Sequence, residues 1–127
     1  LTGHLWQGRF HSCILDEKHL YAAVRYIENN PVRALIAEKA NDWRWSSAKA
    51  HITKCRDKIE LANITKYMEV DDWENYLRVD EDEAIIDKIK KNTLTGRPVG
   101  SEEFVYKFEK LFNRRLAAMP RGRPELK

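Results

Sequence analysis

Apolar side chains recur at a helical spacing along much of the chain. The first such stretch starts at Asp16, a good N-cap residue, and ends before Pro31, which lacks a backbone N–H and disfavours a helical conformation of the residue before it. Since proline suits a first helical turn, Pro31 also predicts the start of a short helix over residues 32–39. The apolar face of the first helix consists of Leu20, Ala23, Val24 and Ile27.

More helices are predicted after this pair. Short helices are expected over residues 46–51 and 71–78, and a longer one runs from about residue 81 to residue 92. The last helix has the clearest signals, with Ser101 as N-cap, acidic residues in its first turn and basic residues in its last. We expect its apolar stripe to be packed into the core; this stripe consists of Phe104, Val105, Phe108, Leu111, Phe112 and Leu116.

One segment favours a strand. Residues 9–15 are rich in strand-forming side chains and lead directly into the helix after Asp16. A single strand has nothing to pair with, which indicates that part of a sheet is missing upstream. We therefore expect an α+β fold in which residues 1–55 are the remnant of a small sheet-plus-helix domain and residues 56–127 are a mainly helical extension with a basic tail.

The 127 residues carry a net charge of only +3, but the charges are unevenly distributed. Residues 67–83 are strongly acidic, whereas the chain from Lys110 onward is basic, so we expect the tail to contact phosphate. No apolar run is long enough to span a membrane. Cys13 and Cys55 are isolated, as is usual in a reducing compartment, and we expect a cytoplasmic protein.

Three motifs in the first 50 residues resemble one protein family. They are Gly3-His4-Leu5-Trp6-Gln7-Gly8-Arg9-Phe10, then Arg25-Tyr26-Ile27-Glu28-Asn29-Asn30-Pro31-Val32-Arg33-Ala34, then Trp45-Ser46-Ser47. In this order they resemble the later half of the REP-associated tyrosine transposases, which belong to the metal-dependent single-strand transposases with a histidine pair. The Gly96-Arg97-Pro98-Val99-Gly100-Ser101 turn and the basic tail also resemble the end of that family. The resemblance implies that residues 1–55 are the carboxy-terminal part of a catalytic domain.

This resemblance assigns chemistry to two residues. It implies that Tyr26 is the nucleophile that attacks a DNA phosphate, and that Asn30 is a ligand of the divalent metal, Mg²⁺ or Mn²⁺. The spacing is compatible with this assignment, because residues four apart on a helix lie on the same face. Phenol is a weak nucleophile at neutral pH, so a metal must activate the phosphate.

The chain departs from the family pattern at the metal site. It contains no His-x-His segment, and His4, His11, His19 and His51 are scattered. We therefore expect these 127 residues to bind no metal on their own and neither to cleave nor to join DNA. Beside the chemical residues, Asn29 and Leu35 replace a common leucine and a common glycine of the family, and Ala48 replaces a frequent aromatic residue.

Other residues are candidates for contact with DNA. Arg9, Arg25 and Arg33 are suited to phosphate, since guanidinium binds it in a forked geometry, although each could equally form a surface salt bridge. Trp6 could stack on an unpaired base, while Trp45 is expected to pack in the core. Arg121 and Arg123, in Pro120-Arg121-Gly122-Arg123-Pro124, resemble the core of an AT-hook for the minor groove, or else belong to an unspecific basic tail.

Three functions follow from these observations. The first is a transposase that acts on single-stranded or hairpin REP-like DNA, in a family that is often dimeric. The second is an inactive derivative that only binds such DNA. The third is a helical regulator in which the helices after Asp80 form a helix-turn-helix; it leaves the motif around Tyr26 unexplained. An unpaired strand edge near residues 10–14 would also favour pairing with a second chain.

Overall fold

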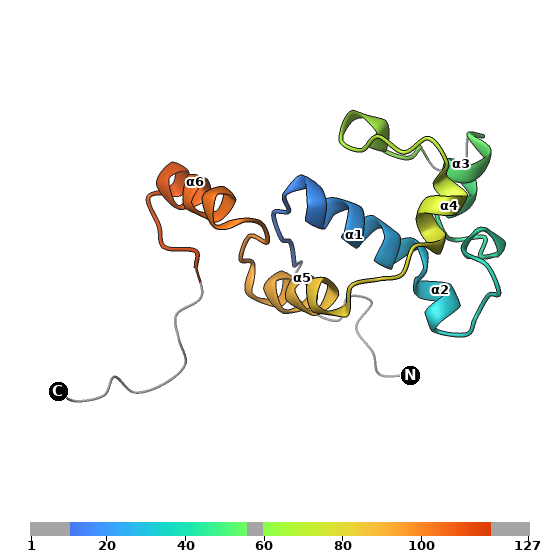
Figure 1. Cartoon of the computed structure of the whole chain (residues 1–127), viewed down its shortest axis with the longest axis horizontal. Coiled ribbons are helices and arrows are strands. Elements are labelled where there is room, and N and C mark those ends of the chain that lie inside the picture. Colours follow the sequence, from blue (N-terminus) through green and yellow to red (C-terminus); the bar gives the residue numbers. More distant parts are fainter. Residues whose placement is uncertain (1–10, 56–59, 118–127) are drawn as a thin grey trace, which may run out of the picture.

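A computed structural model of the chain describes residues 11–55 and 60–117, and these residues fold almost entirely as helices. Figure 1 shows α1 and α5 side by side in the middle of the molecule, with α2, α3 and α4 at one end and α6 at the other. The helices are α1 (Glu17–Glu28), α2 (Asn30–Arg33), α3 (Ala48–Thr53), α4 (Trp73–Arg78), α5 (Glu83–Thr95) and α6 (Glu102–Phe112), with 3₁₀ helices η1 (Ala40–Asp42) and η2 (Ile64–Lys66).

The expected α+β fold is wrong, because the described residues contain no strand and no sheet. Of the predicted strand over residues 9–15, the described part is irregular apart from one isolated parallel bridge between Leu15 and Val99. The Asp16 and Val99 N–H groups donate to the Val99 and Ile14 carbonyls at 3.0 and 2.8 Å. Two backbone hydrogen bonds therefore attach this single extended segment to the turn before α6.

The predicted N-caps Asp16 and Ser101 are confirmed, whereas the N-caps Asp72 and Asp82 were not predicted. Asp16, Asp72, Asp82 and Ser101 each accept a backbone hydrogen bond as the N-cap residues of α1, α4, α5 and α6. The C-cap of α5 is Gly96, whose φ of 67° lies in the left-handed region that favours glycine.

Two helix ends were not predicted. The expected helix over residues 32–39 is reduced to the single turn of α2, with Pro31 in its first turn, because Leu35 adopts a left-handed conformation at φ 56°. At the other end of the chain, α6 stops at Phe112 because Asn113 is left-handed, so Arg114 and Arg115 lie beyond the helix.

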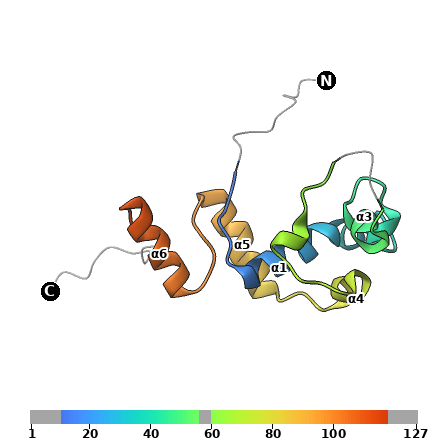
Figure 2. The same ribbon diagram turned by 90° about the horizontal axis from the view of Figure 1, so that it is seen from above.

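The core lies between α1, α3 and α4. Its buried residues are Ala40, Ala48, Met68, Trp73, Tyr76 and Leu77, and half-buried side chains of α1 such as Leu20 and Val24 pack against them. A smaller contact joins α1 to α5, where Ala23 and Ile86 are buried. Figure 2 shows the same division from above, with α6 well away from the α2–α4 end.

The Asp16 carboxylate connects the start of α1 to the start of α6. Its Oδ1 accepts a hydrogen bond from the His19 N–H and lies 2.5 Å from His19 Nδ1, while its Oδ2 accepts from the Ser101 N–H at 3.0 Å. Partial burial alone raises the pKa of Asp16, but these hydrogen bonds have the opposite effect and hold it below 3.8. Gly100 is required beside this carboxylate, because a Cβ there would lie 2.3 Å from the Phe104 ring.

Candidate functional site

The predicted nucleophile lies close to two cationic side chains. Tyr26, in the last turn of α1, is half-buried, and the Arg33 guanidinium lies 3.7 Å from the centre of its ring. On the neighbouring helix α5, the Lys90 ammonium lies 5.0 Å from the same ring centre. No described residue forms a hydrogen bond with the Tyr26 phenol oxygen. The tyrosine is thus placed beside two positive charges with its oxygen free for another contact.

Arg33 brings Tyr26 and Asn30 together. Its Nη2 donates to the Tyr26 carbonyl at 3.1 Å and to the Asn30 Oδ1 atom at 3.3 Å. Three residues of one sequence motif therefore form one cluster, in which Asn30 is exposed at the surface.

The described residues around Asn30 do not fit a divalent metal. The amide oxygen that would be a ligand already accepts a hydrogen bond from a guanidinium cation, which repels a metal ion. His19 and His51 are held by Asp16 and Glu28, and no group of three or more histidine, cysteine, aspartate or glutamate side chains gathers for a metal in the part of the chain that the structure describes. No metal-dependent step can be derived from these residues.

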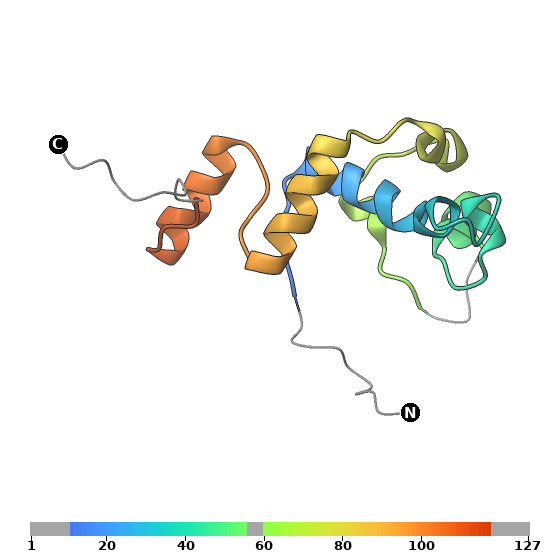
Figure 3. The ribbon, with the colours of Figure 1, turned by 90° about the horizontal axis from the view of Figure 1, so that it is seen from below.

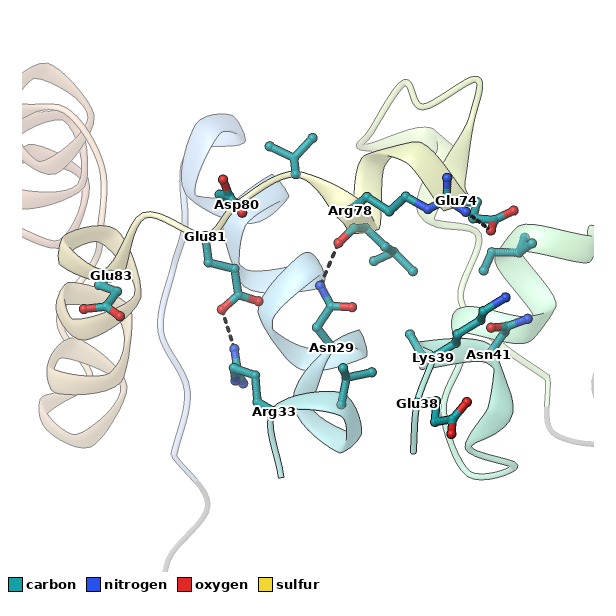
Figure 4. Close-up of a pocket in the computed structure, with 15 residues that line it drawn as sticks. Asn29, Arg33, Glu38, Lys39, Asn41, Glu74, Arg78, Asp80, Glu81 and Glu83 are labelled. Atoms are coloured by element: carbon teal, nitrogen blue, oxygen red, sulfur yellow. Dashed lines mark hydrogen bonds and ion pairs between the residues drawn. The ribbon is translucent and has the colours of Figure 1, made fainter. Parts of the chain in front are cut away.

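A groove of about 730 Å³ adjoins the cluster on the side of α4. Figure 4 shows Arg33 at its edge, paired with Glu81 from the segment between α4 and α5, and Asn29 donating to the backbone of α4. Its lining includes the basic residues Arg33, Lys39 and Arg78 and the acidic residues Glu38, Glu74, Asp80, Glu81 and Glu83. Because acidic side chains outnumber basic ones, the groove itself does not attract phosphate.

Arg25 is integrated into the fold. Its Nε atom donates to the Tyr76 carbonyl at 2.8 Å, and its guanidinium lies 4.6 Å from the centre of the Tyr76 ring. Burial raises the pKa of Tyr76 to about 12, although the nearby arginine acts in the opposite direction, and the Tyr76 hydroxyl donates to the Tyr21 carbonyl. Arg25 therefore ties α1 to α4 whether or not it also contacts DNA.

The remaining candidates lie elsewhere. Arg9, Trp6, Arg121 and Arg123 fall outside the described residues, so their predicted contacts with DNA stay predictions. Trp45 was expected in the core, but its side chain is 68% exposed, and the Arg44 guanidinium lies 4.4 Å from the centre of its ring. The apolar core is filled by Trp73 instead, so Trp45 is available for contact with another molecule.

A buried polar cluster was not predicted from the sequence. The Glu28 side chain is almost fully buried, and its Oε1 atom accepts a hydrogen bond from Ser47 Oγ and lies 2.7 Å from His51 Nδ1. Its Oε2 accepts from the Trp73 indole N–H at 2.7 Å, and the His51 and Trp73 rings lie 4.5 Å apart. Glu28 lies in the second quoted motif and Ser47 in the third. The presence of both motifs in one chain was the signal in the sequence that could have predicted a contact between them.

This cluster does not have the geometry of a serine nucleophile. Ser47 and His51 both contact the same carboxylate oxygen, whereas an activated serine must donate to the histidine ring. The cluster instead satisfies a buried carboxylate and joins α1, α3 and α4, so its role is to stabilise the fold.

The third alternative, a helix-turn-helix formed by the helices after Asp80, gains no support. The segment between Thr95 and Glu102 joins α5 to α6, but α6 does not pack extensively on α5 or on any other helix among the described residues. The two helices of such a motif pack against one another, and here they do not.

Comparison with known proteins gave no match: no family model, no curated protein and no solved structure matches this chain. The likeness to tyrosine transposases therefore rests on the sequence motifs alone. Separately, none of the helices among residues 11–55 and 60–117 is both long enough and apolar enough to cross a membrane.

Proposed function

We propose that this chain binds DNA with unpaired or hairpin regions, as part of a tyrosine transposase that acts on REP-like palindromes in the bacterial cytoplasm. The observation that supports it is the position of Tyr26 close to the Arg33 guanidinium and the Lys90 ammonium, with Asn30 bonded to the same guanidinium. Two cations close to a phenol whose oxygen forms no hydrogen bond with a described residue favour a phosphate group nearby.

Arg33 has to exchange partners for this contact. In the free protein it pairs with Glu81, and both side chains are partly buried. A DNA phosphate that approaches Tyr26 competes with the Glu81 carboxylate for the same guanidinium. Lys90 is less restricted, since its nearest carboxylate, on Asp87, is 3.8 Å away. We therefore expect Lys90 to make the first electrostatic contact and Arg33 the tighter one.

In the transposase reaction, the Tyr26 oxygen would form a bond to phosphorus while the bond to the 3′ oxygen breaks and that oxygen leaves as a hydroxyl. This step needs a metal bound by a histidine pair, and the 127 residues contain no His-x-His segment. The function proposed for the chain by itself is accordingly binding without cleavage.

The binding part is tested with two adjacent lysines of α5. A fluorescent hairpin with a single-stranded flank is titrated with the wild type, Lys90→Gln and Lys91→Gln, and anisotropy gives the dissociation constant at several salt concentrations. Both variants lose one charge from an exposed position. Lys90→Gln is expected to raise the dissociation constant several-fold and to reduce the slope of log affinity against log salt concentration by about one. Lys91→Gln is expected to change both quantities less. Equal effects would show that binding depends only on net charge and would contradict the site.

The chemical part is tested with the same hairpin in the presence of Mn²⁺. We expect equal binding by the wild type and Tyr26→Phe and no covalent adduct with either, as resolved on denaturing gels. An adduct formed by the wild type and absent with Tyr26→Phe would show that the chain cleaves DNA without further histidines, contrary to the binding-only proposal.

A further inference from the structure

Helix α6 presents an apolar face that no other described element covers. Phe104, Val105, Phe108, Leu111 and Phe112 occupy one side of the helix. Leu111 is 69% exposed and Phe112 is 55% exposed, and the other three are only half-buried. Soluble proteins rarely leave a continuous apolar stripe in contact with water unless it binds something.

The stripe is ordered along its length. The Phe104 and Phe108 rings pack edge to face at 4.9 Å between centres, and the Phe108 and Phe112 rings stack at 6.0 Å. The start of the helix is fixed by the hydrogen bond from Ser101 to Asp16. Figure 3 shows that α6 stands at the end of the molecule, apart from α1 and α5, so a second molecule can reach this face.

The charges along α6 indicate which molecule fits. Glu102 and Glu103 lie in its first turn, while Lys110 lies in its last turn and Arg114 and Arg115 follow directly after it. The helix therefore has an acidic start and a basic end. Such a helix is complementary to a copy of itself that runs in the opposite direction, and it repels a copy that runs in the same direction.

We propose that α6 pairs with α6 of a second copy of this chain, in an antiparallel arrangement about a twofold axis near Phe108. Phe104 and Phe112 are each four residues from Phe108, so Phe104 of each helix then faces Phe112 of the other. The acidic start of each helix lies opposite the basic end of the other, and the helix dipoles are opposed as well. This proposal does not depend on the proposed DNA-binding function.

The resulting dimer should be weak. A helix of 11 residues offers a small contact, below the roughly 1,200 Å² of stable interfaces. Association is therefore expected to depend on concentration in the micromolar range or above. It would double the number of DNA-binding surfaces in one particle.

Sedimentation velocity of the full chain over about two decades of concentration around that range tests the proposal. We expect the wild type to shift from monomer to dimer, and Leu111→Lys to raise the dimer dissociation constant at least about tenfold. Phe108→Glu should have the same effect at the centre of the face. The matched control is Tyr106→Lys, which removes a 56% exposed ring outside the apolar stripe and should leave the dimer intact. Circular dichroism verifies that each variant keeps its helices.

Orientation is tested by salt and by charge reversal. An antiparallel pair weakens as salt screens its attractive ends, whereas a parallel pair strengthens. Glu102→Lys with Glu103→Lys should impair self-association, and mixing this variant with Arg114→Glu and Arg115→Glu should restore it. A chain that stays monomeric at every concentration, or a dimer that persists in Leu111→Lys, overturns the proposal; the first result would mean that another segment or another protein covers the face.

Discussion

The α1–α4 region and helix α6 have similar apolar patterns but differ in burial. In the first region the buried aromatic side chains Trp73 and Tyr76 also carry a polar atom with a partner: the Trp73 indole N–H donates to Glu28, and the Tyr76 hydroxyl donates to the Tyr21 carbonyl. Helix α6 carries a row of phenylalanines that contact chiefly one another. An apolar stripe therefore defines one face of a helix, while polar contacts from distant segments determine which face becomes the core.

The largest effect is expected at the polar centre of the first region. Glu28→Ala removes the acceptor for three side chains and leaves the buried Trp73 N–H unpaired, so we expect a loss of about 3–5 kcal/mol in the free energy of unfolding. Urea denaturation followed by tryptophan fluorescence measures it. Glu17→Ala, at an exposed position of the same helix, is the control and should cost less than about 1 kcal/mol. A small effect of Glu28→Ala would mean that the cluster does not hold these helices together.

A matched pair of leucine substitutions compares the two regions directly. Leu77 is buried on α4 and Leu111 is 69% exposed on α6. Leu77→Ala should therefore cost about 2–4 kcal/mol, while Leu111→Ala should cost less than about 0.5 kcal/mol in the monomer. Both are measured by urea denaturation at low protein concentration. Equal losses in the free energy of unfolding would show that Leu111 is buried in solution and that α6 is packed as closely as α4.

The contact of Asp16 with Ser101, which connects α1 to α6, should make an intermediate contribution to the free energy of unfolding. Asp16→Ala removes the N-cap of α1 and the contact with Ser101, so we expect a loss of about 1–2 kcal/mol at neutral pH. Asp16→Asn keeps much of the capping ability without the charge and serves as the control. Thermal unfolding of both variants and the wild type measures the effect.

The same contact predicts a pH dependence. The pKa of Asp16 is lower in the folded chain than its ordinary value of 3.8, so the folded state favours the charged form. The stabilisation is fully present above that ordinary value and is lost as the pH falls through the lowered pKa. The advantage of the wild type over Asp16→Asn should therefore shrink in acid, and an advantage that is independent of pH would contradict this role of the carboxylate.

Local signals in the sequence predicted local structure. The N-caps at Asp16 and Ser101 and the turn before α6 follow from backbone chemistry within a few residues, and the structure agrees with them. Tyr26 and Asn30 were expected on one face of one helix; instead α1 ends at Glu28 and Asn30 begins α2, while Arg33 contacts both the Tyr26 carbonyl and the Asn30 amide oxygen. Their proposed chemistry remains a prediction.

Long-range contacts were not predictable in the same way. Glutamate is usually exposed, and Glu28 is buried because its carboxylate contacts Ser47, His51 and Trp73. These residues lie 19, 23 and 45 positions further along the chain, too far for a local pattern to predict the contacts. Leu35 replaces a glycine that is common in the family, and its left-handed φ of 56° is a conformation that favours glycine. A leucine in the sequence does not predict a left-handed conformation, so the end of α2 could not be placed in advance. The apolar stripe of α6 has the helical periodicity of a core helix. Periodicity predicts which residues share a face, but not whether another segment of the chain covers that face.

The bridge between Leu15 and Val99 has a consequence for synthesis of the chain. These residues are 84 positions apart, and a ribosome that adds about 5–20 residues per second needs roughly 4–17 s to pass from one to the other. During this time α1 emerges from the ribosomal exit tunnel, while α5, the helix that packs against it, has not yet been synthesised. The half-apolar surface of the first helix is thus available to chaperones in every newly made copy, and the chain completes its fold only when its last third has been translated.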